Sequence, residues 1–443
     1  MSNGLTRQHN AKSLLVFAMP TIIMMVFMSQ YTMVDGIFVA NFVSESALAG
    51  LNIVIPALSI LVSLSIMLSA GGSVVISRKL GEGKDREAKE DLTFIVGITV
   101  LFGAVVTVLA LIFAEPILGL LGATENLFPV AYDYYKVLVM VTVPCLLQVQ
   151  FQYLFVTAGA PNLGLGCVVA GGVSNVILDY VFIVALDLGI QGAALATGIG
   201  YSIPAVVGLA WFACNRKGML CFTMPKFRFS TLKESIVNGV ASMIINLSGA
   251  TVTWLYNRVV VLHLGEDGIA AATIVLYARF MFNSVLSGYA SGVAPVISFN
   301  YGRKDFAQVK LLFWTSLKAV LAGSALVLLA SVFLRDPIVA LFASNAPEIA
   351  AIATRGIFLF AFSYLFNGVN TFAATLFSAL NNGKVSALMA FLTTFVFLVA
   401  AIFGLPAIGL GADGVWLAVP AAEMLSLFVT LFLLKKNRAR YGF

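Results

Sequence analysis

The sequence predicts an all-α polytopic membrane protein with twelve transmembrane helices in two similar six-helix halves. Three observations lead to this prediction, the first of which is composition. Hydrophobic residues make up 60% of the 443 residues and charged residues only 10%, whereas a soluble domain carries about 25% charged residues. Second, apolar stretches of about 20 or more residues recur along the whole chain, and each is long enough to cross a hydrocarbon core of about 30 Å. The third observation is an internal repeat.

The second half of the chain repeats residues of the first half at a nearly constant spacing. Nine residues recur unshifted 221 positions later, namely Val39, Glu45, Ala49, Ile53, Gly71, Val75, Ile76, Ser77 and Gly81. Near the end of each half the spacing becomes 222, so that Gly189 and Gly192 recur as Gly411 and Gly414. Chance identities are common between apolar segments, but a constant spacing over two long stretches indicates duplication. Two similar halves in a membrane chain are typical of transporters that work at the boundary between the halves.

The twelve predicted spans follow one another in order, six in each half. They cover about 13–40, 47–77, 92–114, 130–157, 162–185, 190–213, 234–262, 269–297, 308–333, 351–379, 385–406 and 412–434. Glycine and proline inside these spans are compatible with helix, because neighbouring spans can satisfy the freed backbone groups. We therefore expect a first lobe over residues 1–213, a connection over 214–233 and a second lobe over 234–443.

Lysine and arginine gather in the loops on one side of this arrangement. The N-terminus, the connections from even- to odd-numbered spans and the C-terminus hold 20 of the 26 basic residues. The positive-inside rule therefore predicts a multi-pass protein of the cytoplasmic membrane with both termini in the cytoplasm. Six spans per half is an even number, so both halves should enter the membrane in the same direction. The net charge of +6 reflects this topology and attraction to anionic lipid, and we expect no nucleic-acid partner.

The sequence predicts neither a redox site nor a nucleotide site. Cys145 and Cys167 lie within spans, and Cys214 and Cys221 lie in the connection predicted to be cytoplasmic, so we expect no disulfide. The cysteines and the two histidines have no metal-ligand spacing, and the chain has no Walker A sequence. We therefore expect a secondary active transporter and not an enzyme, without a cofactor and driven by an ion gradient.

The loop after the second span, GEGKDREAKE from Gly81, is strongly charged. Its spacing Gly81-x-x-x-Asp85-Arg86 partly resembles the loop signature of the major facilitator superfamily, but residues 88–90 depart from the glycine and two basic residues with which that signature continues. We interpret the loop as a solvated, charged turn that opens an amphipathic helix.

Three acidic residues lie well inside predicted spans: Asp35, Asp179 and Glu423. Ionisable residues within a membrane are costly, which predicts a functional role. Asp35 and Asp179 lie about 8 and 9 Å from the outer ends of their spans, and Thr197 lies about 10 Å from the outer start of its span. Asn175 precedes Asp179 by one turn on the same helix face. Asp35, Asn175, Asp179 and Thr197 are therefore expected at one level of the first lobe. The alternative is that they only join helices by hydrogen bonds.

Other residues are candidates for the lining of a substrate cavity. In the first lobe these are Pro20, Tyr31, Tyr135 and Gln152, and in the second lobe Asn246, Tyr277, Asn283, Asn367, Asn370 and Glu423. Pro20 permits either a functional or a static kink, and aromatic packing or an interfacial belt is the alternative for the two first-lobe tyrosines. Arg279 is able to neutralise Glu423, which would leave a structural pair in place of a site.

Several segments, taken together in their order, carry a resemblance to a known family. They are Pro20 followed by YTMVDGIFVANFVSESALAG, the loops ISRKLGEGKDREAKE and ISFNYGRKDFAQVK, and the segments TAGAPN, SNVILDYVFI, LGIQGAALAT, FSALNNGK and GADGVWLAVPAAE. Over essentially its whole length the chain resembles the prokaryotic type of the multidrug and toxin extrusion (MATE) family of secondary transporters. The resemblance implies two six-helix lobes that form a V and expose a central cavity to alternate sides. It also implies that Asp35, Asn175, Asp179 and Thr197 couple transport to a cation.

We therefore expect a proton- or sodium-coupled antiporter that exports small organic, often cationic or amphiphilic compounds such as drugs by alternating access. The oxygen ligands of the four coupling residues suit sodium, and a desolvated pair of carboxylates suits a proton. The alternative is an exporter or flippase of one lipid-linked or anionic metabolite on a related fold. A non-transporting scaffold or receptor is disfavoured, because a scaffold has no need for buried paired acids. The expected partners are small-molecule substrates and membrane lipid, and we expect a monomer.

Overall fold

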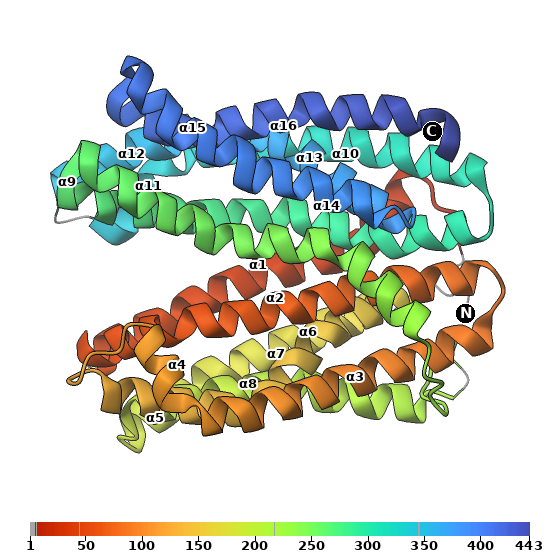
Figure 1. Cartoon of the computed structure of the whole chain (residues 1–443), viewed down its shortest axis with the longest axis horizontal. Coiled ribbons are helices and arrows are strands. Elements are labelled where there is room, and N and C mark those ends of the chain that lie inside the picture. Colours follow the sequence, from red (N-terminus) through yellow and green to blue (C-terminus); the bar gives the residue numbers. More distant parts are fainter. Residues whose placement is uncertain (1–4, 6, 44, 217, 344–345) are drawn as a thin grey trace. The chain divides into compact units, whose positions relative to one another are not determined.

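The computed structural model consists of helices joined by short connections (Figure 1), and no β-strand occurs in the described part of the chain. It describes residues 5–443 except 6, 44, 217 and 344–345. Within the helices it leaves out the side chains of residues 31–42, 45, 46, 48, 250, 251, 254, 257 and 266. The prediction of an all-α membrane protein is confirmed.

The helices of the two halves follow one another in the predicted order. The first half holds α1 (Ala11–Phe42), α2 (Glu45–Gly81), α3 (Asp85–Ile112), α4 (Ala114–Leu120), α5 (Phe128–Met140), α6 (Thr142–Thr157), α7 (Pro161–Asp179), the π-helix η1 (Tyr180–Ala185) and α8 (Gly189–Cys214). The second half holds α9 (Phe229–Gly302), α10 (Phe306–Phe333), α11 (Arg335–Ala343), α12 (Pro347–Ala361), α13 (Tyr364–Ala379), α14 (Gly383–Phe391), η2 (Leu392–Phe397), α15 (Leu398–Leu405), η3 (Pro406–Leu410) and α16 (Gly411–Tyr441).

Some predicted spans are bent or joined in the structure. The fourth and tenth spans are each broken, because α5 meets α6 at 55° and α12 meets α13 at 51°. Eight helical stretches of the described chain are long and apolar enough to cross a membrane, and ten when each bent pair counts as one span. One of them, Gly383–Tyr441, has 59 residues and holds two predicted spans. It reverses at Gly409 and Gly411, whose φ angles of 101° and 50° suit glycine.

The internal repeat is visible in these irregular features. The short helix α4 begins at Ala114, and its counterpart α11 begins 221 residues later at Arg335. The two broken spans occupy equivalent places in the halves. Gly265 interrupts α9 with a φ of 68°, between the predicted spans 234–262 and 269–297. The similar residues therefore fold into similar helices.

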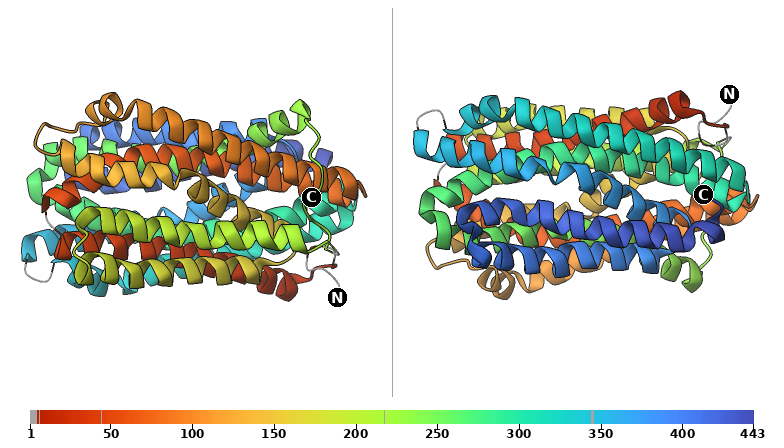
Figure 2. Two further views of the ribbon diagram at one scale, coloured as in Figure 1. Left: turned by 90° about the horizontal axis from the view of Figure 1, so that it is seen from below. Right: turned by 90° about the horizontal axis from the view of Figure 1, so that it is seen from above.

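The described chain divides into two compact units. The first comprises Met1–Arg7 and Phe27–Gly239, and the second comprises Gln8–Val26 and Val240–Phe443. Within each unit the helices run side by side (Figure 2). Both units include part of α1. The early part of α1 packs against α9 in the second unit, where a Cβ on Gly288 would lie only 2.7 Å from the Cα of Ile22. The units differ from the expected lobes in two places. Residues 8–26 belong to the second unit and not to the first, and residues 234–239 belong to the first unit and not to the second.

In each unit the connections from even- to odd-numbered spans lie at one end. In the second unit, Gln308 donates a hydrogen bond to the carbonyl of His9, and Asn382 donates one to the hydroxyl of Tyr441. The ring of Tyr301 packs against that of Tyr441 at 5.9 Å. In the first unit, ion pairs join the start of α3 to the connection after α8. The distribution of basic residues predicted that these connections share one side. Which side of the membrane they face stays a prediction.

Candidate ion and substrate sites

A close contact between α7 and α8 builds the first candidate site. A Cβ on Gly171 of α7 would lie 2.6 Å from the carbonyl oxygen of Gly200 in α8. Because both residues lack a side chain, the two helix backbones approach closely. One turn further along α7, a Cβ on Gly200 would lie 3.2 Å from the Cβ of Asn175. The glycines therefore bring Asn175 against α8.

Three of the four predicted coupling residues are buried in this part of the first unit: Asn175, Asp179 and Thr197. The amide nitrogen of Asn175 lies 3.4 Å from the hydroxyl oxygen of Thr197. The Oδ1 atom of Asn175 has no hydrogen-bond partner among the described residues. Asp179 is the last residue of α7, one turn after Asn175. The fourth predicted residue, Asp35, lies with Tyr31 in the stretch of α1 whose side chains are outside the described residues.

The arrangement suits a small cation. A buried amide oxygen without a partner costs free energy, and a cation beside it would satisfy it. Carboxylate, amide and hydroxyl oxygens are the ligands that hard cations prefer. Asn175, Asp179 and Thr197 supply one of each. The side chains that the structure describes contain no cluster of three or more His, Cys, Asp or Glu residues of the kind that holds a transition metal.

A second polar group surrounds Glu423 of α16 in the second unit. Its carboxylate accepts hydrogen bonds of 2.8 Å from the side-chain amides of Asn367 and Asn370 in α13. The Asn370 amide also reaches the backbone carbonyl of Glu423 at 2.9 Å, and the hydroxyl of Thr430 donates to Oδ1 of Asn370 at 2.8 Å. This network joins α13 to α16 and compensates the buried carboxylate.

The network borders a cavity of about 60 Å³, which Arg279 and Asn283 also line. The Oδ1 atoms of Asn283 and Asn367 have no hydrogen-bond partner among the described side chains. The guanidinium of Arg279 lies over the ring of Phe360 at 5.9 Å. The structure thus brings together four predicted cavity residues. Arg279 lines the same cavity and its charge acts on Glu423, so the alternative in which Arg279 neutralises Glu423 stays a prediction.

The other predicted cavity residues lie elsewhere. Tyr135 is buried in the apolar core of the first unit, and its hydroxyl donates to the carbonyl of Ala110 at 3.0 Å, which fits the packing alternative. Gln152 is buried, with its amide nitrogen 3.2 Å from the sulfur of Met28. Tyr277 is exposed and stacks on Phe342. Asn246 is exposed, and Pro20 is buried within a continuous α1.

Glu90, Asp91 and Gln150 are among the buried polar side chains of the first unit that sequence reasoning missed. Glu90 and Asp91 of α3 are buried, so the interpretation of this loop as solvated is wrong for Glu90. Gln150 of α6 is fully buried, and neither atom of its amide has a hydrogen-bond partner among the described residues. The sequence search ranked residues by depth in the membrane, and depth does not report burial between helices.

Comparison with known proteins gives matches along the whole chain. Residues 20–181 and 239–403 match the family model described as MatE. The multidrug export protein MepA of Staphylococcus aureus (strain bovine RF122 / ET3-1) is 23% identical over 435 residues, which are 97% of this chain and 94% of that protein. MepA of Staphylococcus saprophyticus subsp. saprophyticus is 23% identical over 416 residues, with coverages of 90% and 89%.

Two solved structures match with high TM-scores. An outward-facing multidrug resistance MATE family transporter of the MOP superfamily has a TM-score of 0.93 at 20% identity, with coverages of 100% and 99%. A mutant of the Vibrio cholerae MATE transporter VcmN has a TM-score of 0.90 at 20% identity, with 98% of each chain covered. At these identities the structures show the fold alone, and they confirm the predicted twelve-helix fold.

Proposed function

The chain belongs to the MatE family of multi-pass membrane transporters, and from this premise we propose that it is a cation-coupled antiporter that exports small organic compounds, including drugs. Its relatives are named multidrug export proteins, which supports drugs as the class of substrate. The observation that carries the coupling is the buried group of Asn175, Asp179 and Thr197. We propose that this group and Asp35 bind a proton or a sodium ion.

The packing of α1 on α7 supports the inclusion of Asp35. A Cβ on Gly172 of α7 would lie 2.5 Å from the ring of Phe27 in α1, so the two helices are neighbours there. Both are odd-numbered spans of the predicted topology and run in the same direction. Asp35 lies eight residues beyond Phe27, about 12 Å along the helix, and Asp179 lies seven residues beyond Gly172, about 10 Å. The two acids are therefore expected at one level.

Two carboxylates at one level in a low-dielectric layer explain why the site would bind a cation. Desolvation and mutual repulsion both disfavour two charged groups, so the pair takes up a proton or a sodium ion. We propose that a cation loaded from outside repacks α1 and thereby expels the substrate outward. The cation then leaves to the cytoplasm by alternating access. The membrane potential favours its inward movement by about 2.3 kcal/mol per charge per 100 mV when it crosses the whole field.

We propose a location in the cytoplasmic membrane with both termini in the cytoplasm, and topology reporters test this orientation. A reporter fused after Phe443 or inserted within 216–233 should report cytoplasm, because 20 of the 26 basic residues share that side. A reporter within 120–127 or 184–190 should report the outside. Alkaline phosphatase and green fluorescent protein fusions measure the two locations. An external signal from 216–233 would contradict the twelve-span topology.

Transport by the purified protein in liposomes tests the function itself. We expect an imposed proton or sodium gradient to drive several chemically unrelated cationic dyes and drugs in the direction opposite to the cation. The fold and the buried oxygen atoms of Asn175, Asp179 and Thr197 support such an exchange of cation for substrate. Fluorescence of the accumulated dyes measures the transport rate, and liposomes without protein are the control. A response to one gradient and not to the other identifies the coupling ion.

One observation supports a second candidate function, the export of a lipid-linked or anionic metabolite. Arg279 lines the cavity beside Glu423, and its guanidinium is a cation that is able to bind an anionic group. Under this alternative, drugs would not move in the liposomes, whereas one anionic or lipid-linked compound would be transported.

A further inference from the structure

The connection between α8 and α9 is irregular, yet specific contacts hold it along α3. Residues 221–228 form no helix. The backbone N–H of Thr223 donates to the hydroxyl of Thr93 at 3.0 Å, and the ring of Phe227 packs edge-on against Phe94 at 5.4 Å. Thr93 and Phe94 lie where α3 passes from its charged start into its apolar part. The connection is therefore fixed at the level where α3 enters the membrane.

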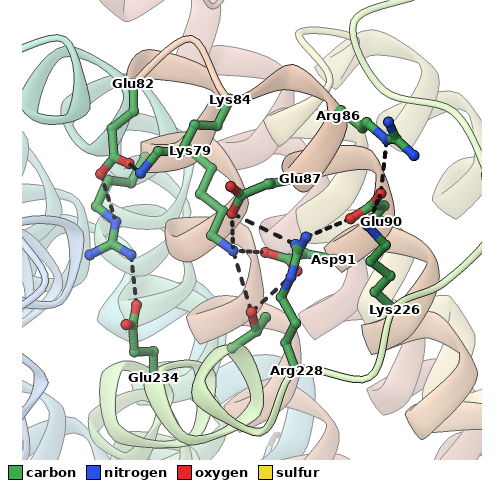
Figure 3. Close-up of polar contacts among 12 residues, drawn as sticks. Lys79, Glu82, Lys84, Arg86, Glu87, Glu90, Asp91, Lys226, Arg228 and Glu234 are labelled. Atoms are coloured by element: carbon green, nitrogen blue, oxygen red, sulfur yellow. Dashed lines mark hydrogen bonds and ion pairs between the residues drawn. The ribbon is translucent and has the colours of Figure 1, made fainter.

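Ion pairs hold the end of the connection (Figure 3). The guanidinium of Arg228 lies 2.6 Å from a carboxylate oxygen of Glu90 and 3.1 Å from one of Asp91, and the ammonium of Lys79 also contacts Asp91. The side chains of Glu90 and Asp91 are only 4% and 0% exposed. Removal of one partner would leave a buried charge, so these pairs strongly oppose detachment of the segment.

In the exposed turn beside them, a hydrogen bond to Glu82 raises the pKa of Lys84 above its ordinary value.

The outward side of this fixed segment is apolar. Met224, Phe227 and Phe229 are 87%, 75% and 66% exposed, although they lie within six consecutive residues. Single exposed apolar side chains are ordinary, but a cluster of large ones marks a contact surface. Cys214 ends α8 and Phe229 begins α9. Gly189–Cys214 is long and apolar enough to cross a membrane, and the seventh predicted span begins at about residue 234, so the segment between them lies at the membrane surface.

The charge of the connection identifies the kind of surface that it fits. Residues 214–233 contain five basic residues and no acidic residue. The side chain of Lys226, between the exposed Met224 and Phe227, is 59% exposed and lies 3.6 Å from Glu90. Lys233 in the first turn of α9 is also exposed. Exposed aromatic side chains beside lysines are typical of segments that lie in the interface between water and anionic lipid.

We propose that residues 222–229 form a membrane-surface anchor of the first unit. Met224, Phe227 and Phe229 enter the adjoining lipid leaflet, and Lys226 and Lys233 bind the headgroups of anionic phospholipids. The ion pairs of Glu90 and Asp91 keep the anchor ordered before it meets lipid, which lowers the entropy cost of its binding. The orientation proposed above makes this the cytoplasmic leaflet, but the anchor depends only on the position of the segment between two spans.

The depth of a nitroxide spin label in nanodiscs tests the anchor. Cys214→Ser provides the background, because Cys214 is exposed and the other three cysteines are buried. In this background we compare Met224→Cys with Lys84→Cys, which lies in the exposed α2–α3 turn. With increasing phosphatidylglycerol in phosphatidylcholine, the label at 224 should become accessible to oxygen and protected from a water-soluble nickel complex. The label at 84 should stay accessible to nickel.

Substitution of one lysine tests the anionic lipid. Lys226→Gln should weaken binding of the segment to the anionic membrane roughly fivefold, the effect of one basic side chain near an anionic surface, and so shift this change to a higher fraction of phosphatidylglycerol. Lys384→Gln, an equal loss of charge at an exposed residue outside the segment, should leave it unchanged. Equal nickel access at 224 and 84 would overturn the anchor, and protection at 224 from both reagents would show a protein partner instead. The same depth without phosphatidylglycerol would overturn the anionic headgroup. None of these outcomes depends on transport activity.

Discussion

We expect Asp179→Asn to abolish gradient-driven export, to the rate of liposomes without protein, while the protein stays folded in the membrane. Asp179 is buried at the end of α7, and asparagine has nearly the same volume. The amide carries no charge to compensate a sodium ion and takes up no proton at physiological pH. The variant therefore loses the exchange of a cation without losing its packing. Transport rates under imposed proton and sodium gradients measure the effect, and substrate binding by fluorescence polarisation should survive.

Asp187→Asn is the matched control for this loss of charge. Asp187 is exposed, and its φ of 51° is a conformation that asparagine adopts readily, so transport should be retained. Asp35→Asn should behave like Asp179→Asn, and Glu423→Gln should have the smaller effect. Normal transport by both aspartate variants together with a dead Glu423→Gln variant would place the coupling site in the second unit.

The fold was largely predictable because the membrane imposes the length and composition of each span. Spans of about 20 apolar residues with charged ends coincide with helices from α1 to α16, and the repeat predicted that the halves would correspond. The breaks within the fourth and tenth spans were not predicted, although in the fourth span Pro144 follows the break at Val141 and a proline disrupts the preceding helical turn. The assignment of residues 8–26 to the second unit depends on the close approach of Ile22 to Gly288, which has no local signal.

The candidate site was predictable in part. Asn175 and Thr197 are brought together as their equal depth predicted, because helix geometry converts residue number into depth. The cavity around Glu423 includes Asn367 and Asn370, but no pattern indicated that their amides would compensate the carboxylate. Burial of Asp91 was not predicted, because it requires contacts with a connection more than 130 residues away in sequence. Whether these groups bind a cation or a substrate stays a prediction.

The other large effect is expected for Gly239→Ala, which should strongly destabilise the first unit. An added Cβ would overlap the backbone carbonyl of Met67 in α2, and a Cβ on Gly71 would likewise overlap the carbonyl of Ser235 in α9. The obstacles are backbone atoms, so no side-chain rotation relieves them. We expect the free energy of unfolding to fall by about 3 kcal/mol, the upper range for overpacked interiors. Thermal unfolding in detergent, followed by fluorescence, measures the change.

Gly249→Ala provides the control in the same helix, ten residues further along. A Cβ at this position would meet no atom within 4 Å among the described residues, and alanine favours helix over glycine by up to about 1 kcal/mol. Alanine should therefore lower the free energy of unfolding at position 239 but leave it unchanged or raise it at position 249. Both positions are glycines in α9, so the difference between them is the contact of Gly239 with α2. Equal stability of the two variants would show that α2 and residues 229–239 separate without cost, and that the start of α9 does not belong to the packed first unit.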